Sequence, residues 1–182
     1  MGYLKSFFTF SWDVLKIAVI ALVLAGLVRY FLVQPFFVEG ASMEPNFLDG
    51  DYLLIDEISY YFKSVERGEV IVFHYPLDTS KYYIKRVVGL PNEIIEIKNG
   101  KIVIYNESGQ KGSFINESYL LREGVTMGDI KKKLGRNEYF VLGDNRLFSS
   151  DSRQWGTLPR NDIVGRVWVR AWPLNRAMVF DY

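Results

Sequence analysis

Short runs of β-branched and aromatic residues, each bounded by turn residues, recur along the chain after residue 38. Runs of this length and composition are typical of β-strands. One connection is specific, because Asn99-Gly100 tolerates the positive φ that a two-residue hairpin turn requires. The pattern therefore predicts a mainly β, antiparallel domain. The expected strands cover residues 51–55, 69–75, 82–88, 93–97, 101–105, 138–142 and 163–171.

An apolar segment precedes the β region. Residues 17–28 hold no charge, and Arg29 is followed by four more apolar or aromatic residues. About 17 to 25 residues are needed to cross the hydrocarbon core, so the segment to Val33 suffices if Arg29 extends its charge to the outer interface. A cleaved secretory signal is the alternative, since a short apolar stretch also fits its core. The bulky residues over 30–37 offer no small-residue cleavage site, which favours a retained anchor.

The charges that flank this segment favour one orientation. Lys5 and Lys16 precede it, and only acidic charges follow Arg29 before the next basic residue, Lys63. Basic residues favour the cytoplasmic side, whereas acidic residues contribute little. We therefore predict a cytoplasmic stub and a single transmembrane anchor over 1–34, followed by an extracytoplasmic β-rich domain over 35–182.

The middle of the chain, about 106–137, is more polar and richer in glycine. This composition predicts a smaller inserted subdomain or loop. Within it, Thr126 and Asp129 precede three consecutive lysines and Gly135, an arrangement typical of one or two capped helical turns that end at glycine. We therefore expect a short helix there, with its lysines on a solvated face.

The composition restricts the function classes. The 182 residues carry a net charge of +1, so nothing indicates the clustered basic surface that a nucleic-acid partner favours. The chain has no cysteine, which excludes disulfides and thiolate metal sites. We expect no metal and no cofactor, and the oligomeric state stays open.

A serine is the leading candidate nucleophile, although no histidine is placed to activate it. Ser42 lies in Gly40-Ala41-Ser42-Met43-Glu44-Pro45, and the single histidine, His74, lies in an apolar strand-like run. A serine hydroxyl is a poor nucleophile until a base takes its proton. Lys85 is the best candidate base. Taken alone, it is better interpreted as an exposed lysine of a strand, because lysines are rarely buried.

Three ordered motifs resemble those of the bacterial type I signal peptidases, membrane-bound serine proteases that use a Ser-Lys pair. They are the Ser42 motif, Tyr83-Ile84-Lys85-Arg86-Val87-Val88-Gly89, and Gly143-Asp144-Asn145-Arg146-Leu147-Phe148-Ser149-Ser150-Asp151-Ser152-Arg153. The resemblance implies an N-terminal anchor followed by an antiparallel β-sheet or barrel-like catalytic domain at the lipid bilayer. It also implies the reaction, which is removal of signal peptides from secretory preproteins after an Ala-x-Ala-like site.

The same resemblance implies roles for individual residues. Ser42 would attack the peptide bond and Lys85 would take its proton. A lysine pKa near 8 instead of about 10.4 needs about 3 kcal/mol of environment, which burial can supply. Ser149 is expected to hydrogen-bond the Lys85 amine, while Asp151 pairs with Arg153 or Arg146. The pocket-lining positions of the family correspond here to Phe36, Val38, Met43 and Ile84.

The chain departs from the family pattern close to Ser42. Gly40 stands where many members carry a serine that assists the oxyanion hole, so the candidate donors here are the Ser42 N–H and another amide. Asn46 replaces the usual threonine after Pro45, which we interpret as a tolerated change.

Two other functions stay open. One is a self-cleaving Ser-Lys hydrolase of the repressor type, against which the anchor and the missing DNA-binding domain count. The other is a non-enzymatic, membrane-tethered β module, against which the intact Ser42, Lys85, Ser149 and Asp151 count.

Overall fold

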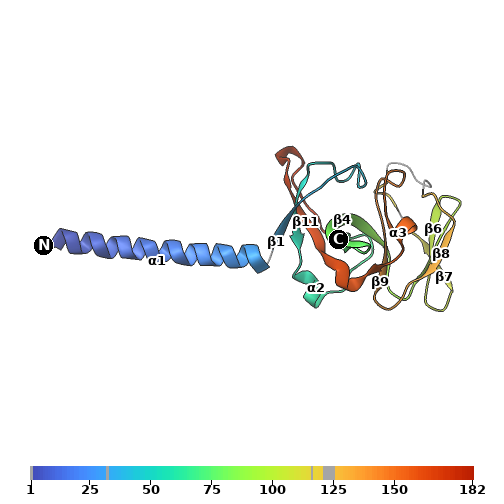
Figure 1. Cartoon of the computed structure of the whole chain (residues 1–182), viewed down its shortest axis with the longest axis horizontal. Helices are drawn as coiled ribbons and strands as arrows, with labels where there is room; N and C mark the ends of the chain where they lie inside the picture. Colours follow the sequence, from blue (N-terminus) through green and yellow to red (C-terminus); the bar gives the residue numbers. More distant parts are fainter. Residues whose placement is uncertain (1, 32, 116, 121–125) are drawn as a thin grey trace.

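A long helix and two antiparallel sheets account for most of the described residues (Figure 1). Helix α1 (Gly2–Phe31) extends away from the sheets, and the N-terminus lies at its far end. It contains no proline, the residue that most strongly breaks a helix. Strand β1 (Val33–Phe37) follows and contains Pro35, which favours an extended conformation in the residue before it. The computed structural model describes residues 2–31, 33–115, 117–120 and 126–182.

The anchor predicted from the sequence falls largely on α1. Within the described residues, no helix combines the length and the hydropathy of a membrane span. The side chain of Arg29, on which the prediction depends, lies outside the described part of the chain, as does residue 32. The anchor therefore stays a prediction.

The larger sheet confirms the mainly β, antiparallel prediction. Its strand order is β1-β2-β11-β3-β4-β9-β10, and β12 pairs with β11. The predicted strands in this sheet begin and end within two residues of the observed ones, except that β4 starts four residues earlier. The remaining strands of this sheet are β2 (Tyr52–Asp56), β3 (Val70–Tyr75), β4 (Asp78–Gly89), β9 (Glu138–Leu142), β10 (Leu158–Pro159), β11 (Ile163–Trp172) and β12 (Met178–Val179).

The smaller sheet has the order β7-β6-β5-β8 and lies at the end of the β region away from α1 (Figure 1). Its strands are β5 (Ile94–Lys98), β6 (Lys101–Tyr105), β7 (Lys111–Phe114) and β8 (Ile130–Lys133). Asn99 and Gly100 both have positive φ between β5 and β6, which confirms the predicted hairpin turn. The described residues of the polar region 106–137 supply strands β7 and β8 of this sheet, and strands β5 and β6 precede the region.

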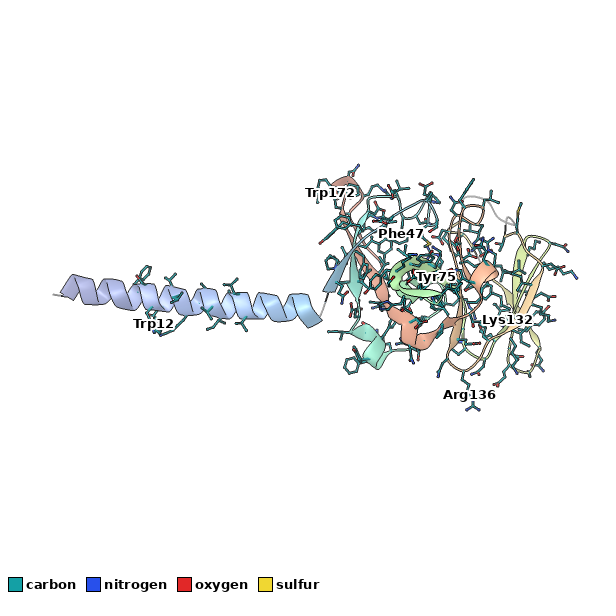
Figure 2. All side chains as sticks on the ribbon, in the orientation of Figure 1. Trp12, Phe47, Tyr75, Lys132, Arg136 and Trp172 are labelled. Carbon is teal, nitrogen blue, oxygen red and sulfur yellow. The ribbon has the colours of Figure 1, made fainter. Side chains whose placement is uncertain are left out.

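The prediction of a short helix before Gly135 is wrong. Residues Ile130–Lys133 form β8, which pairs antiparallel with β5 so that Ile130 lies opposite Ile97. The cross-strand pairing outweighs the local preference for a capped helical turn, because it packs Ile130 against an apolar cluster of the smaller sheet. The three lysines are exposed, as expected of a solvated face, and Figure 2 shows Lys132 at the end away from α1.

Three apolar clusters form the core, and the strand pairing places the functional segments next to one another. Strand β4 lies between β3 and β9, with Lys85 opposite Ile71 and Arg86 opposite Leu142. The loop that begins at Gly143 therefore leaves β9 beside Lys85. Short helices complete the fold, namely α2 (Ser59–Phe62), α3 (Ser152–Trp155), η1 (Arg160–Asp162) and η2 (Leu174–Arg176).

Candidate active site

The side chains of Ser42 and Lys85 meet although they are 43 positions apart. Lys85 Nζ lies 2.8 Å from Ser42 Oγ, within hydrogen-bond distance, and donates a second hydrogen bond to the Ile84 carbonyl at 2.8 Å. The Lys85 residue is only 3% exposed. The reading of Lys85 as an exposed strand lysine is therefore wrong.

Burial lowers the pKa of Lys85 from the ordinary value of 10.5 to about 8. The negative charges of Asp151 and Asp144 act in the opposite direction, but the loss of solvation is the larger effect. At pH 7 a group of this pKa is a neutral amine in about one molecule in ten, against about one in two thousand for a free lysine. Lys85 thus has the environment that a general base requires.

A tight turn over 41–47 presents Ser42. Glu44 N donates to Ala41 O at 3.2 Å, and Phe47 N donates to Met43 O at 2.9 Å. Met43 and Phe47 are fully buried in the core cluster beneath the turn, and Figure 2 shows Phe47 inside the β region. The apolar residues of the turn therefore point inward and leave Ser42 partly exposed beside Lys85.

The loop after β9 contacts this turn directly. Asn145 donates from its backbone N to Ser42 O and from Nδ2 to Ala41 O, both at 3.0 Å. Gly143 lies so close that a Cβ there would be 2.5 Å from Ser42 O. Only glycine permits this approach without displacement of the Ser42 backbone.

Asp151 organises the same loop, and the expected pairing with Arg153 is confirmed. Arg153 Nε lies 2.8 Å from Asp151 Oδ1, and Arg153 N donates to the same oxygen at the start of α3. Asp151 Oδ2 accepts from Gly143 N at 3.1 Å. Arg146 instead pairs with Glu117 at 2.6 Å and donates to Gly143 O at 3.0 Å.

The prediction of a hydrogen bond between Ser149 and Lys85 is wrong. Ser149 Oγ is buried and has no hydrogen-bond partner among the described residues. Lys85 Nζ directs its hydrogen bonds to Ser42 and to the Ile84 carbonyl instead. Ser149 nonetheless packs against Gly143, within the loop that contacts the Ser42 turn.

Sequence reasoning gave no role to a buried ion pair beside the site. Arg86 donates from Nε and Nη2 to the two oxygens of Asp144, at 2.8 and 2.6 Å. Asn46 Nδ2 donates to Asp144 Oδ2 at 2.8 Å. The adjacency of Arg86 to Lys85 was a usable signal. By contrast, the hydrogen bond between Asn46 and Asp144 joins residues 98 positions apart, so no local sequence pattern indicated it.

A cleft of about 710 Å³ adjoins Ser42 and Lys85. Three of the four residues expected to line a substrate pocket, Phe36, Val38 and Ile84, border it. Met43 does not, because its side chain is fully buried in the core below the turn. The other residues that line the cleft are Pro35, Phe37, Glu39, Leu53, Val72, Lys81, Tyr82, Tyr83 and Ser150.

A hydroxyl and a buried amine at hydrogen-bond distance beside a cleft are the groups of a serine hydrolase. Residues 11–172 match the family described as signal peptidase, peptidase S26, and the chain belongs to this family. It is therefore a serine protease of the signal peptidase I type.

Two relatives found by sequence similarity agree with this membership. The chain is 34% identical to the probable signal peptidase I-1 of Synechocystis over 91% of this chain and 86% of the relative. It is 32% identical to signal peptidase IB of Staphylococcus aureus over 89% of each chain. A crystal structure of a signal peptidase I from Enterococcus faecalis aligns with a TM-score of 0.48 and 27% identity, over 57% of this chain and 97% of that one.

Proposed function

We propose that this chain is a membrane-anchored endopeptidase that removes signal peptides from secretory preproteins, with Ser42 as nucleophile and Lys85 as general base. The observation that carries the proposal is the 2.8 Å contact between Ser42 Oγ and the buried Lys85 amine. Family membership favours this function over the self-cleaving and non-enzymatic alternatives.

The geometry supports a simple sequence of proton transfers. Ser42 Oγ attacks the carbonyl carbon of the scissile bond while neutral Lys85 accepts its proton. The resulting ammonium then donates that proton to the leaving amine, and a water attacks the acyl-enzyme with Lys85 again as base. Among the described residues, the hydrogen bonds of the turn leave the Ser42 N–H without a partner, so it is our candidate oxyanion donor.

The loop after β9 is proposed to support the pair rather than to take part in proton transfer. Asp151 with Arg153 holds the loop closed, and Arg146 secures the Gly143 carbonyl. Ser149 fills the space against Gly143. Each contact limits movement of the segment that lies against the Ser42 turn.

Substrate selection is proposed to depend on the apolar walls of the cleft. Phe36, Val38 and Ile84 border the cleft, and in this proposal they admit only small side chains at the first and third positions before the scissile bond. Overfilling a packed site costs about 1 to 3 kcal/mol.

We predict that leucine in place of alanine immediately before the bond lowers kcat/KM of a secretory precursor by about 10- to 100-fold. Purified protein in detergent is incubated with the precursor, and the new N-terminus of the product is sequenced. Leucine at the second position is the matched control, because alternate side chains of an extended substrate point to opposite faces. Equal cleavage of all three precursors would reject these walls as the selecting surface.

The proposed anchor is the segment within α1, with the N-terminus in the cytoplasm. Helix α1 runs for 30 residues, and β1 begins two residues after it ends. Because Pro35, Phe36 and Phe37 of β1 line the cleft, a membrane-spanning α1 places the cleft close to the outer bilayer surface.

We predict that protease added outside intact spheroplasts digests an epitope inserted in the exposed turn at 106–110, but not an epitope at the N-terminus. The charges that flank the apolar segment favour this orientation. Lysed spheroplasts provide the control in which both epitopes are digested. Protection of the 106–110 epitope in intact spheroplasts would place the catalytic region in the cytoplasm.

A further inference from the structure

The contacts around the site close into a ring through Asn46. The turn leads from Ser42 to Asn46, whose Nδ2 donates to Asp144 Oδ2 at 2.8 Å. Asp144 is paired through both oxygens with Arg86. Arg86 is the neighbour of Lys85, and Lys85 Nζ returns to Ser42 Oγ. The ring therefore connects the Ser42 turn to the strand of Lys85 by side-chain contacts in addition to the direct contact between Ser42 and Lys85.

Two consecutive residues hold the two ends of the turn. Asn145 donates to the carbonyls of Ala41 and Ser42 at the front, and Asp144 accepts from Asn46 at the back. Because Asp144 is also bound to Arg86, the back of the turn is tied to the strand that carries Lys85. The contacts of Asn145 hold only the front of the turn, so the hydrogen bond from Asn46 to Asp144 is what connects the back of the turn to β4.

The surroundings of Asn46 restrict it further. Its Nδ2 also donates to the Tyr119 carbonyl at 2.9 Å, and its own carbonyl accepts from Arg170 Nη2. The guanidinium of Arg86 lies over the Tyr119 ring, with Arg86 Cζ 4.2 Å from the centroid of the ring. Both hydrogens of the amide are therefore committed, one of them to a carboxylate that is fully buried.

We propose that Asn46 is a positioning residue that holds the Ser42 turn at the correct distance from Lys85. The inference rests on the proposed Ser42–Lys85 mechanism and revises the view of Asn46 as a merely tolerated change. An asparagine suits this place because a neutral amide donates two hydrogen bonds without adding charge beside Asp144. A shift of about 1 Å between reacting groups is enough to cost about 100-fold in rate.

The test compares Asn46→Ala with Asn46→Asp in the full chain, in detergent, with a secretory precursor. Asn46→Ala is expected to lower kcat by about 10- to 100-fold at unchanged KM, because the substrate cleft does not include this side chain. Asn161→Ala is the matched control, since Asn161 is exposed in η1, and it is expected to retain the wild-type kcat.

The aspartate variant separates positioning from a general loss of stability. Asn46→Asp keeps the shape of the side chain but places a second carboxylate beside Asp144, so kcat is expected to fall as well. The added negative charge also joins Asp144 and Asp151, the carboxylates that already act on Lys85, and moves the ascending limb of the pH–rate profile to higher pH. Asn46→Ala is expected to lower the plateau without moving that limb.

The outcomes separate this inference from the proposed function. If kcat per folded molecule equals that of wild type in both variants, with only the melting temperature lowered, Asn46 is structural and the inference fails. If Asn46→Ala does not fold, kcat per folded molecule of the shape-conserving variant Asn46→Asp is compared with that of the wild type by the same criterion. If the Ser42→Ala variant cleaves the precursor as fast as the wild type does, the proposed function itself fails.

Discussion

Replacement of Ser42 or of Lys85 by alanine is expected to abolish precursor cleavage, with a loss of about 10⁴-fold or more in kcat. Each substitution removes one member of a pair that lies at 2.8 Å and acts as a unit. For the same reason the double variant is expected to be no less active than either single variant. The measurement is product formation from a secretory precursor in single-turnover experiments.

Folding must be shown to survive these substitutions. Lys63→Ala and Ser64→Ala are matched controls, because both residues are exposed on the protein surface and are expected to leave the rate unchanged. Circular dichroism of the β type in every variant shows that the sheets persist. Substantial turnover by a folded Ser42→Ala or Lys85→Ala variant would exclude the Ser-Lys mechanism.

The cleavage rate of the wild type is expected to rise with pH through an ionisation near 8. Only the neutral amine of Lys85 accepts a proton, and burial lowers its pKa to about 8. Well below that pH, the neutral fraction and therefore the rate increase about tenfold per pH unit, and the rate levels off above it. The measurement is kcat as a function of pH between about 6 and 10.

Lys85→Arg is expected to be as inactive as Lys85→Ala across that pH range, because a guanidinium stays protonated at any usable pH. His74 is the control for the origin of the ascending limb. Its Nδ1 lies 2.8 Å from the Thr79 carbonyl, and among the described residues it forms no hydrogen bond with Ser42 or Lys85. The limb should therefore persist in His74→Ala. An active Lys85→Arg variant, or a profile without an ascending limb, would point to another base.

Most strands were predictable because the signals for them are local. A short run of β-branched and aromatic residues between turn residues is visible within a few positions, as is the Asn99-Gly100 hairpin. The segment before Gly135 misled the prediction for the same reason. Its capping pattern is local, whereas the pairing of Ile130 with Ile97 that makes it a strand is not.

The site shows the same division between local and distant information. The motifs and their resemblance to a known family indicated Ser42 and Lys85 as the candidate reactive groups, and the apolar neighbours of Lys85 in the sequence agree with its burial. They misplaced Met43, which packs in the core, and assigned Ser149 a hydrogen bond that it does not make. Which way a side chain points from a turn depends on the surface beneath it.

Local runs of strand-forming residues between turns were enough to predict the β class of the fold, and the resemblance of three motifs to a known family named the chemical groups of the candidate site. The burial of Lys85 and its 2.8 Å contact with Ser42 could be seen only in the folded chain. It also decided that Asn46 is tied to Asp144, and through it to the strand of Lys85. Burial and hydrogen-bond partners depend on segments far apart in the chain, and the pairing of strands β3, β4 and β9 brings those segments together.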